Sequence, residues 1–130
     1  MKVFEREIVA QLEDIDELGH VNNAVWVRWI QDMATDHWYA ASRAEHHLAY
    51  VWLVVRHEID YLRSVGPGET VTGRTWVGEA PKGARFDRHV EFTGADGKPR
   101  VRARTTWAIL DRTTGRPLRV PPEVIAPFLA

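Results

Sequence analysis

The chain of 130 residues is about the length of one domain, and we expect residues 1–130 to form a single domain around one core. Its 17 Lys and Arg residues against 18 Asp and Glu residues give a formal charge of -1, so no global field attracts nucleic acid or an anionic membrane. The sequence has no cysteine, which excludes disulfides, thiolate nucleophiles and thiolate zinc sites. The first residues are too charged for a secretory signal and no run of ~18 apolar residues occurs, so we predict a cytoplasmic protein that binds neither nucleic acid nor membranes.

The predicted elements begin with a strand over residues 4–12, followed by one long helix. From Asn23 to about Glu45, apolar residues recur with the i, i+3, i+4, i+7 spacing of one helical face. Asn22 or Asn23 is suited to cap the helix, because an Asn side-chain oxygen accepts a free backbone N–H. The predicted buried face contains Trp26, Trp29, Ile30, Met33, His37, Trp38 and Ala41.

Four further strands are predicted at residues 50–62, 69–78, 84–93 and 100–110, separated by Gly and Pro turns. Alternation along the last two strands puts apolar residues on one face of each. These are Phe86, Val90 and Phe92 in one strand and Val101, Ala103, Trp107 and Ile109 in the other. On the opposite face, Arg100, Arg102 and Arg104 are expected to form a solvated, ion-paired surface, and a short Pro-rich tail follows.

These elements predict an α+β fold in which an antiparallel sheet of about five strands wraps one long helix. The apolar run at residues 50–55 indicates a strand that is buried on both faces. A dimer that continues the sheet would bury the second face, so we expect a homo-oligomer.

The segment DIDELGHVNN, residues 14–23, contains the residues best suited to a metal site, a turn or a reaction. Its DxDxxG pattern opens a calcium loop, but the loop positions that should carry oxygen ligands are Leu18 and Val25. Zinc would require a second histidine at helical spacing, which is absent. We therefore expect no metal and no cofactor.

Two interpretations of this segment remain open. In the first, the Asp residues accept backbone hydrogen bonds, Gly19 allows a positive φ and an Asn caps the helix, so every polar group is structural. In the second, the free N–H groups at the helix N-terminus polarise a carbonyl oxygen beside a carboxylate. A carboxylate with an oxyanion donor is the minimum set of groups for acyl transfer.

The same residues resemble a known family. The pattern DxDxxGHxNN, followed by a long helix and four strands, is similar to hotdog-fold acyl-CoA thioesterases of the 4-hydroxybenzoyl-CoA thioesterase type. The likeness covers nearly the whole chain and is most specific at residues 14–29, DIDELGHVNNAVWVRW. It implies a hotdog fold, an acyl-CoA substrate, and a homodimer or homotetramer. Because plant acyl-carrier-protein thioesterases carry a similar HVNN segment, the motif indicates acyl thioesters more firmly than CoA.

The resemblance implies a role for each polar residue of the motif. Asp16 would attack the thioester carbonyl or activate a water molecule, and the backbone N–H of Asn23 would stabilise the oxyanion. Asp14 would organise the loop. His20 and Asn22 would orient water or substrate, although a loop histidine and a helix cap explain these two residues equally well.

The resemblance also implies substrate contacts elsewhere. Trp26 stands where the family commonly has Tyr, which removes a hydroxyl from the pocket wall, and Val55 would line the acyl channel with Trp26, Trp29 and Ile30. Family members bind the CoA nucleotide at the turn between the third and fourth strands, often from the neighbouring subunit. In this chain Lys82, Gly83 and Arg85 occupy that turn and Arg88 follows it, although a solvated hairpin tip explains the same charges.

Two other functions use the same fold. A hotdog hydratase or dehydratase would add or remove water across the double bond of an acyl thioester, and a non-catalytic domain would bind the thioester without cleaving it. Hydrolysis is favoured because a thioester carbonyl is reactive enough for a carboxylate and a helix dipole. No GxSxG motif is present to supply a serine nucleophile.

Overall fold

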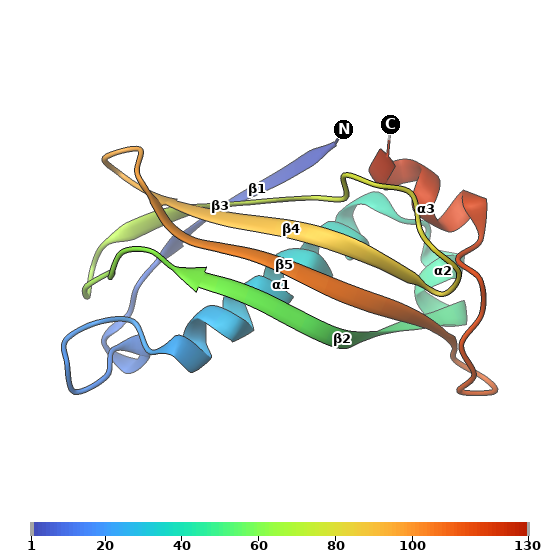
Figure 1. Cartoon of the computed structure of the whole chain (residues 1–130), viewed down its shortest axis with the longest axis horizontal. Helices are drawn as coiled ribbons and strands as arrows, with labels where there is room; N and C mark the ends of the chain where they lie inside the picture. Colours follow the sequence, from blue (N-terminus) through green and yellow to red (C-terminus); the bar gives the residue numbers. More distant parts are fainter. Residues whose placement is uncertain (1, 130) are drawn as a thin grey trace.

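A computed structural model describes residues 2–129 and shows an antiparallel sheet curved around one long helix, α1 (Figure 1). The five strands follow the order β1-β3-β4-β5-β2, and every neighbouring pair is antiparallel. The elements are β1 (Val3–Val9), the 3-10 helix η1 (Leu12–Asp14), α1 (Asn23–Ala41), α2 (Ala44–Ala49), β2 (Tyr50–Tyr61), β3 (Thr70–Trp76), β4 (Arg85–Gly94), β5 (Pro99–Asp111) and α3 (Pro122–Leu129). This arrangement confirms the predicted α+β hotdog fold. None of the helices within residues 2–129 is long and apolar enough to cross a membrane.

The long helix α1 ends earlier than predicted. It begins at Asn23 and buries the predicted face apart from Ala41, which is half-buried. The helix stops at Ala41 rather than near Glu45. Ser42 adopts an extended backbone, and both its N–H and its hydroxyl donate to the carbonyl oxygen of Trp38. A serine that bonds the preceding turn in this way competes with helix continuation. The chain resumes as the short helix α2 after this break.

The two ends of the chain also differ from the prediction. The first strand stops at Val9, because the segment that follows it turns into η1. The predicted Pro-rich tail contains α3, which buries Val124, Ile125 and Phe128. Pro122 is compatible with the first helical turn, where the backbone N–H has no helical partner. Proline content alone therefore gave the wrong expectation for this segment.

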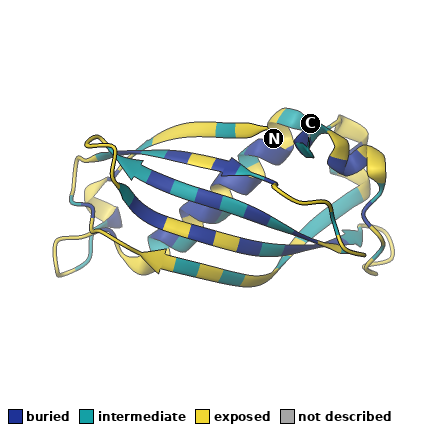
Figure 2. Cartoon of the chain, turned by 45° about the horizontal axis from the view of Figure 1, so that its top comes forward, coloured by how far each residue is buried: buried dark blue, intermediate teal, exposed yellow. Residues whose placement is uncertain are grey.

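Burial alternates along the strands, as Figure 2 shows, because one face of the sheet packs on α1 while the other faces outward. The predicted inward faces of β4 and β5 are confirmed, and all seven of their apolar residues are buried. On the outer face, Arg102 pairs with Glu91 and Arg104 pairs with Asp87. Arg100 also forms an ion pair, with Asp96 at 3.0 Å, but it is not solvated: it is buried beside Gly94 and donates to the carbonyl oxygen of Lys98.

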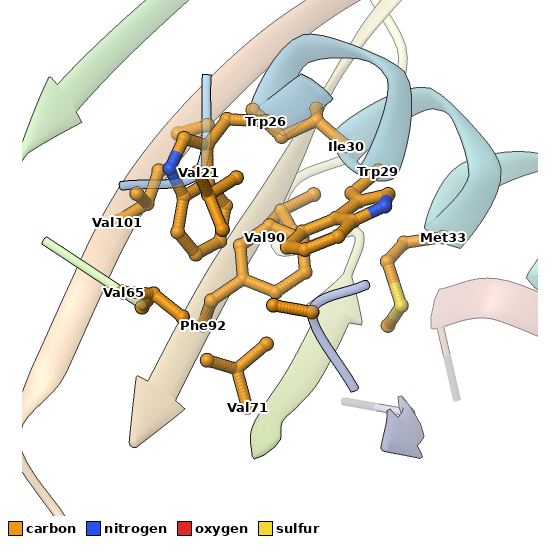
Figure 3. Packing of buried hydrophobic residues seen from close by; sticks show 12 residues of the cluster. Val21, Trp26, Trp29, Ile30, Met33, Val65, Val71, Val90, Phe92 and Val101 are labelled. Carbon is orange, nitrogen blue, oxygen red and sulfur yellow. The ribbon is translucent and has the colours of Figure 1, made fainter. Parts of the chain in front are cut away.

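The core under the first half of α1 is built on three aromatic rings (Figure 3). The ring of Trp26 lies 5.0 Å from that of Trp29 and 5.2 Å from that of Phe92, centroid to centroid. Gly73 of β3 packs closely against this cluster, since an added Cβ would lie 2.9 Å from the sulfur of Met33 and 3.0 Å from the ring of Phe92. A second cluster lies under the other half of α1 and includes α3.

Strand β2 forms one edge of the sheet and is interrupted near its middle. A β-bulge shifts the register between Val54 and Arg56, so Val55 has no direct partner on β5. Leu53 and Val55 are 46% and 42% exposed. The outward face of this apolar strand is therefore uncovered in one chain, and a second subunit remains a prediction.

The placement of Arg88 corrects the expectation that it extends a basic surface. Arg88 shares the inward face of β4 with Phe86 and Val90, and only 3% of it is exposed. Its Nη1 donates to Nδ1 of His37 at 2.8 Å and to the hydroxyl of Thr75 at 3.2 Å. Because an arginine can only donate, Nδ1 of His37 must be an unprotonated acceptor.

His37 should make the stability of the protein depend on pH. Burial, followed by the charge of Arg88, lowers the pKa of His37 from 6.5 to about 4. The unfolded chain therefore binds a proton more readily than the folded chain between these values, and stability falls as the pH drops from 6.5 toward 4. At about pH 5 the expected loss is roughly 1 to 2 kcal/mol, allowing for residual solvent screening.

The variant His37→Gln isolates this effect, because glutamine can accept from Arg88 and does not titrate. It should be less stable at every pH, having lost the stacking with Phe4 and the edge contact with Phe128. Urea unfolding at about pH 7.5 and pH 5 measures the free energy of unfolding at each pH. The difference between the two values should be smaller in the variant than in the wild type. Burial also lowers the pKa of His57, which adds to the fall in both proteins. An unchanged pH difference would contradict the assignment to His37.

Candidate functional site

Residues 14–23 form a compact loop between η1 and α1, and backbone bonds close it. Ile15 and Val21 pair across the loop, and the N–H of Val21 donates to the carbonyl oxygen of Val65 at 2.8 Å. Asp14 is buried and accepts from the N–H of Gln11 at 2.9 Å, and its other oxygen lies 3.2 Å from Arg28. These contacts give Asp14 the geometry of the loop organiser that the resemblance implies.

The carboxylate of Asp16 is held by one oxygen. Its Oδ1 accepts from the backbone N–H of Leu18 at 2.9 Å and from that of His20 at 3.4 Å. The turn is completed by Gly19, whose φ of 81° favours glycine. Within residues 2–129, Oδ2 of Asp16 has no hydrogen-bond partner. The loop thus fixes the carboxylate while leaving one oxygen available for another group.

The start of α1 leaves one backbone donor available. The side chain of Asn22 caps the helix by accepting from the N–H of Ala24 at 2.8 Å. The N–H groups of Val25 and Trp26 donate to the carbonyl oxygen of Asn22 at 3.0 and 3.2 Å. In the described part of the chain, the N–H of Asn23 has no such partner. This is the group expected to bind an oxyanion, at the positive end of the helix dipole.

A cavity of about 440 Å³ lies between this loop and the end of β2. Five of the predicted site residues line it: Asp16, His20, Asn22, Asn23 and Trp26. The remaining wall includes four residues that the sequence did not suggest: Tyr61, Leu62, Arg63 and Ser64. The hydroxyl of Tyr61 lies 3.5 Å from the carbonyl oxygen of Asn23, so a phenol reaches the cavity although Trp26 lacks one.

Other predicted site residues lie elsewhere in the chain. Val55 is at the bulge of β2 and does not line this cavity. Lys82, Gly83 and Arg85 form the turn between β3 and β4, where Lys82 and Arg85 exchange backbone hydrogen bonds and Gly83 has a φ of 61°. That turn lies at the end of the sheet near α2 and α3, opposite the start of α1 (Figure 1). One chain therefore does not bring these three residues to Asp16.

The described residues 2–129 contain no group of three or more His, Asp or Glu side chains that could hold a metal ion. Asp14 and Asp16 do not converge, because Asp14 is buried against Arg28 whereas Asp16 lines the cavity. The polar groups that line the cavity include the Asp16 carboxylate, the His20 imidazole, the amides of Asn22 and Asn23 and the Tyr61 phenol.

Replacing Asn22 tests whether its side chain does more than cap α1. Asn22→Ala should lower the free energy of unfolding by about 1 kcal/mol, because the N–H of Ala24 loses its acceptor. Asn22→Ser preserves a capping oxygen and should restore most of this stability in urea unfolding. If the serine variant is stable but turns over thioesters slowly, the Asn22 amide also contacts substrate or water.

Comparison with protein families places this hotdog fold in the thioesterase class. The chain belongs to the Thioesterase-like superfamily, whose family profile matches residues 10–128. This membership confirms the expected class of enzyme but does not single out the 4-hydroxybenzoyl-CoA subtype. A sequence comparison with curated proteins finds no match.

Solved structures share the fold at low sequence identity. The hypothetical protein SAV2348 from Staphylococcus aureus, solved in complex with CoA, has a TM-score of 0.87 at 16% identity, with 97% of this chain and 81% of that chain covered. A thioesterase from Thermus thermophilus, complexed with coenzyme A and Zn, has a TM-score of 0.82 at 22% identity. The match covers 95% of this chain and 90% of that one. An acyl-ACP thioesterase from Bacteroides thetaiotaomicron has a TM-score of 0.81 at 22% identity, and the match covers 89% of this chain and 49% of that one.

Proposed function

We propose that the protein hydrolyses acyl-CoA thioesters to a free acid and CoA in the cavity beside Asp16. The observation that carries the proposal is that Asp16 and Asn23 line the same cavity. The carboxylate of Asp16 is anchored through one oxygen, and the N–H of Asn23 has no hydrogen-bond partner among residues 2–129. A thioester carbonyl is weakly stabilised by resonance and its thiolate leaves readily. These two groups can therefore suffice without a serine, histidine and aspartate triad.

In this mechanism, Oδ2 of Asp16 either attacks the carbonyl carbon or takes a proton from the attacking water. The carbonyl electrons move onto its oxygen, where the N–H of Asn23 stabilises the negative charge. The carbon–sulfur bond then breaks and CoA leaves as the thiolate. If Asp16 attacks directly, water cleaves the resulting anhydride and regenerates the carboxylate. Anchoring Oδ1 reduces the motions that must be lost before reaction.

The other polar groups of the cavity have supporting roles in the proposal. His20 and Asn22 orient water or the thioester. The hydroxyl of Tyr61, 3.5 Å from the carbonyl oxygen of Asn23, supplies the cavity with a hydroxyl that Trp26 lacks. Trp26, packed on Trp29 and Phe92, forms the rigid apolar wall against the acyl group.

We assign the CoA phosphates to Lys82, Gly83 and Arg85 of a second subunit. The β3–β4 turn lies at the far end of its own sheet, and the exposed edge of β2 carries Leu53 and Val55. An antiparallel pairing of two β2 edges would carry the turn of one subunit toward the Asp16 end of the other. In this proposal residues 1–130 form one hotdog domain, and the protein is a homodimer or homotetramer. We also propose that it acts in the cytoplasm. Two relatives of this fold were solved with CoA.

A thiol-release assay tests the proposed reaction. Short, long and aromatic acyl-CoAs, together with one acyl carrier protein thioester, should be compared at equal concentration. Release of free thiol from an acyl-CoA is the expected result. Hydration of crotonyl-CoA without thiol release would instead indicate a hydratase. Calorimetric binding of acyl-CoA without either reaction would indicate a binding domain.

A further inference from the structure

A second cavity, of about 190 Å³, lies under the other end of α1 and shares no lining residue with the Asp16 cavity. Residues of α1, β2, β4, β5 and α3 surround it. Most of its wall is aromatic, with contributions from Trp38, Trp52, Phe86, Trp107 and Phe128. Such a wall would suit a compact apolar molecule.

The lining of this cavity carries positive charge without an acidic residue beside it. Arg88 and Arg112 both line it, and none of its lining residues is acidic. The protein partners of Arg88 are the neutral acceptors His37 and Thr75, with the rings of Phe86 and Phe128 at 5.8 and 5.7 Å from its guanidinium carbon. Burial lowers the pKa of Arg88 to about 10, so the group is still a cation at neutral pH.

Two buried donors of this cavity wall lack acceptors. Nε of Arg88 and the indole Nε1 of Trp107 have no hydrogen-bond partner among residues 2–129. Both residues are more than nine-tenths buried, at 3% and 9% exposure. Buried polar groups are nearly always paired, because an unpaired one loses its bonds to water without replacement. Two residues that line this cavity therefore each carry an N–H group whose acceptor the described chain does not supply.

We propose that this cavity binds a small carboxylate on a compact apolar body, such as an aromatic acid. The carboxylate would accept from Arg88 and Trp107, and the ring would pack among the aromatic side chains. The volume is adequate, since a cavity of about 150 Å³ in another protein holds benzene. A carboxylate suits an arginine because its two oxygens match the parallel donors of a guanidinium.

Calorimetry with benzoate tests the charge requirement, with benzamide as a neutral probe of the same shape. Benzoate should bind at least tenfold more tightly than benzamide. The Asp16→Asn variant should bind benzoate as the wild type does, because the two cavities share no residue. Equal binding of the two probes, or no binding of benzoate, would overturn the proposal. Loss of binding in Asp16→Asn alone would place benzoate in the other cavity and would also overturn it.

Variants of the two donors locate the bound probe. Arg88→Met should weaken benzoate binding at least tenfold while the circular dichroism spectrum is retained. Trp107→Phe removes only the indole N–H and part of the ring, and should weaken binding severalfold. If Arg88→Met does not fold, benzoate binding to Trp107→Phe tests the proposal instead. Benzoate binding that survives both changes would show that Arg88 is only a core residue with His37 and Thr75 as its partners.

Discussion

Replacing Asp16 with Asn is expected to lower kcat for thioester hydrolysis by about 100- to 10,000-fold, the usual contribution of a positioned base. The substitution removes the charge and the basicity of the carboxylate, and so prevents both attack on the carbonyl and activation of water. An amide oxygen can still accept from the N–H groups of Leu18 and His20, so the turn should persist. Thiol release under saturating acyl-CoA measures the effect.

The neighbouring Glu17 provides a matched control, because it is an exposed carboxylate in the same loop that does not line the cavity. Glu17→Gln removes the same charge and should keep turnover within about twofold of the wild type, as expected for an exposed charge. Near-normal turnover of Asp16→Asn, with its unfolding midpoint unchanged, would refute the catalytic assignment. If Glu17→Gln lowered turnover as much as Asp16→Asn, the loss would come from removing negative charge from the loop and not from removing a positioned base.

The second large effect is expected in the core. Phe92→Ala should lower the free energy of unfolding by about 3 to 5 kcal/mol, because it removes a large ring from a tightly packed site. Phe92 is fully buried between the rings of Trp26 and Trp29, and an added Cβ at Gly73 would lie only 3.0 Å from it. Neighbours this closely packed cannot easily fill the space left by the ring. Urea unfolding at neutral pH measures the loss.

Phe92→Leu is the control for this prediction. Leucine fills more of the site than alanine does, so its variant should lose clearly less stability. A loss below about 1 kcal/mol in Phe92→Ala would mean that the core collapses around the gap, contrary to the packing described. The alanine variant should also turn over substrate more slowly, since Trp26 lies against Phe92 and lines the Asp16 cavity.

Periodic patterns predicted the main elements of the fold because they reflect which face of each element is buried. The spacing of Trp26, Ile30 and Met33 identified α1, and alternation identified the inward faces of β4 and β5. The same alternation places Arg88 inside, between Phe86 and Val90. The prediction that Arg88 extends a basic surface followed from its charge alone and was wrong. The alternation of inward and outward residues along β4 indicates its buried position.

The polar loop could be predicted because its groups are close in sequence, whereas the opposite wall of the cavity could not. Tyr61 and Arg63 line the same cavity as Asp16, beside the hydrogen bond between Val21 and Val65. These residues are distant from Asp16 in the sequence, and no local pattern reveals that they lie together. The second cavity depends likewise on α3, whose Phe128 packs against Trp38 and His37. Both cavities are products of long-range packing rather than of motifs.

The bulge at Val55 has a consequence for the selectivity of the exposed sheet edge. A straight strand from an unrelated protein could bond to β2 only up to the irregularity, beyond which donors and acceptors no longer match. Such an interruption discourages the indiscriminate strand addition that leads to aggregates. The bulge therefore limits how far a foreign strand can extend this exposed edge.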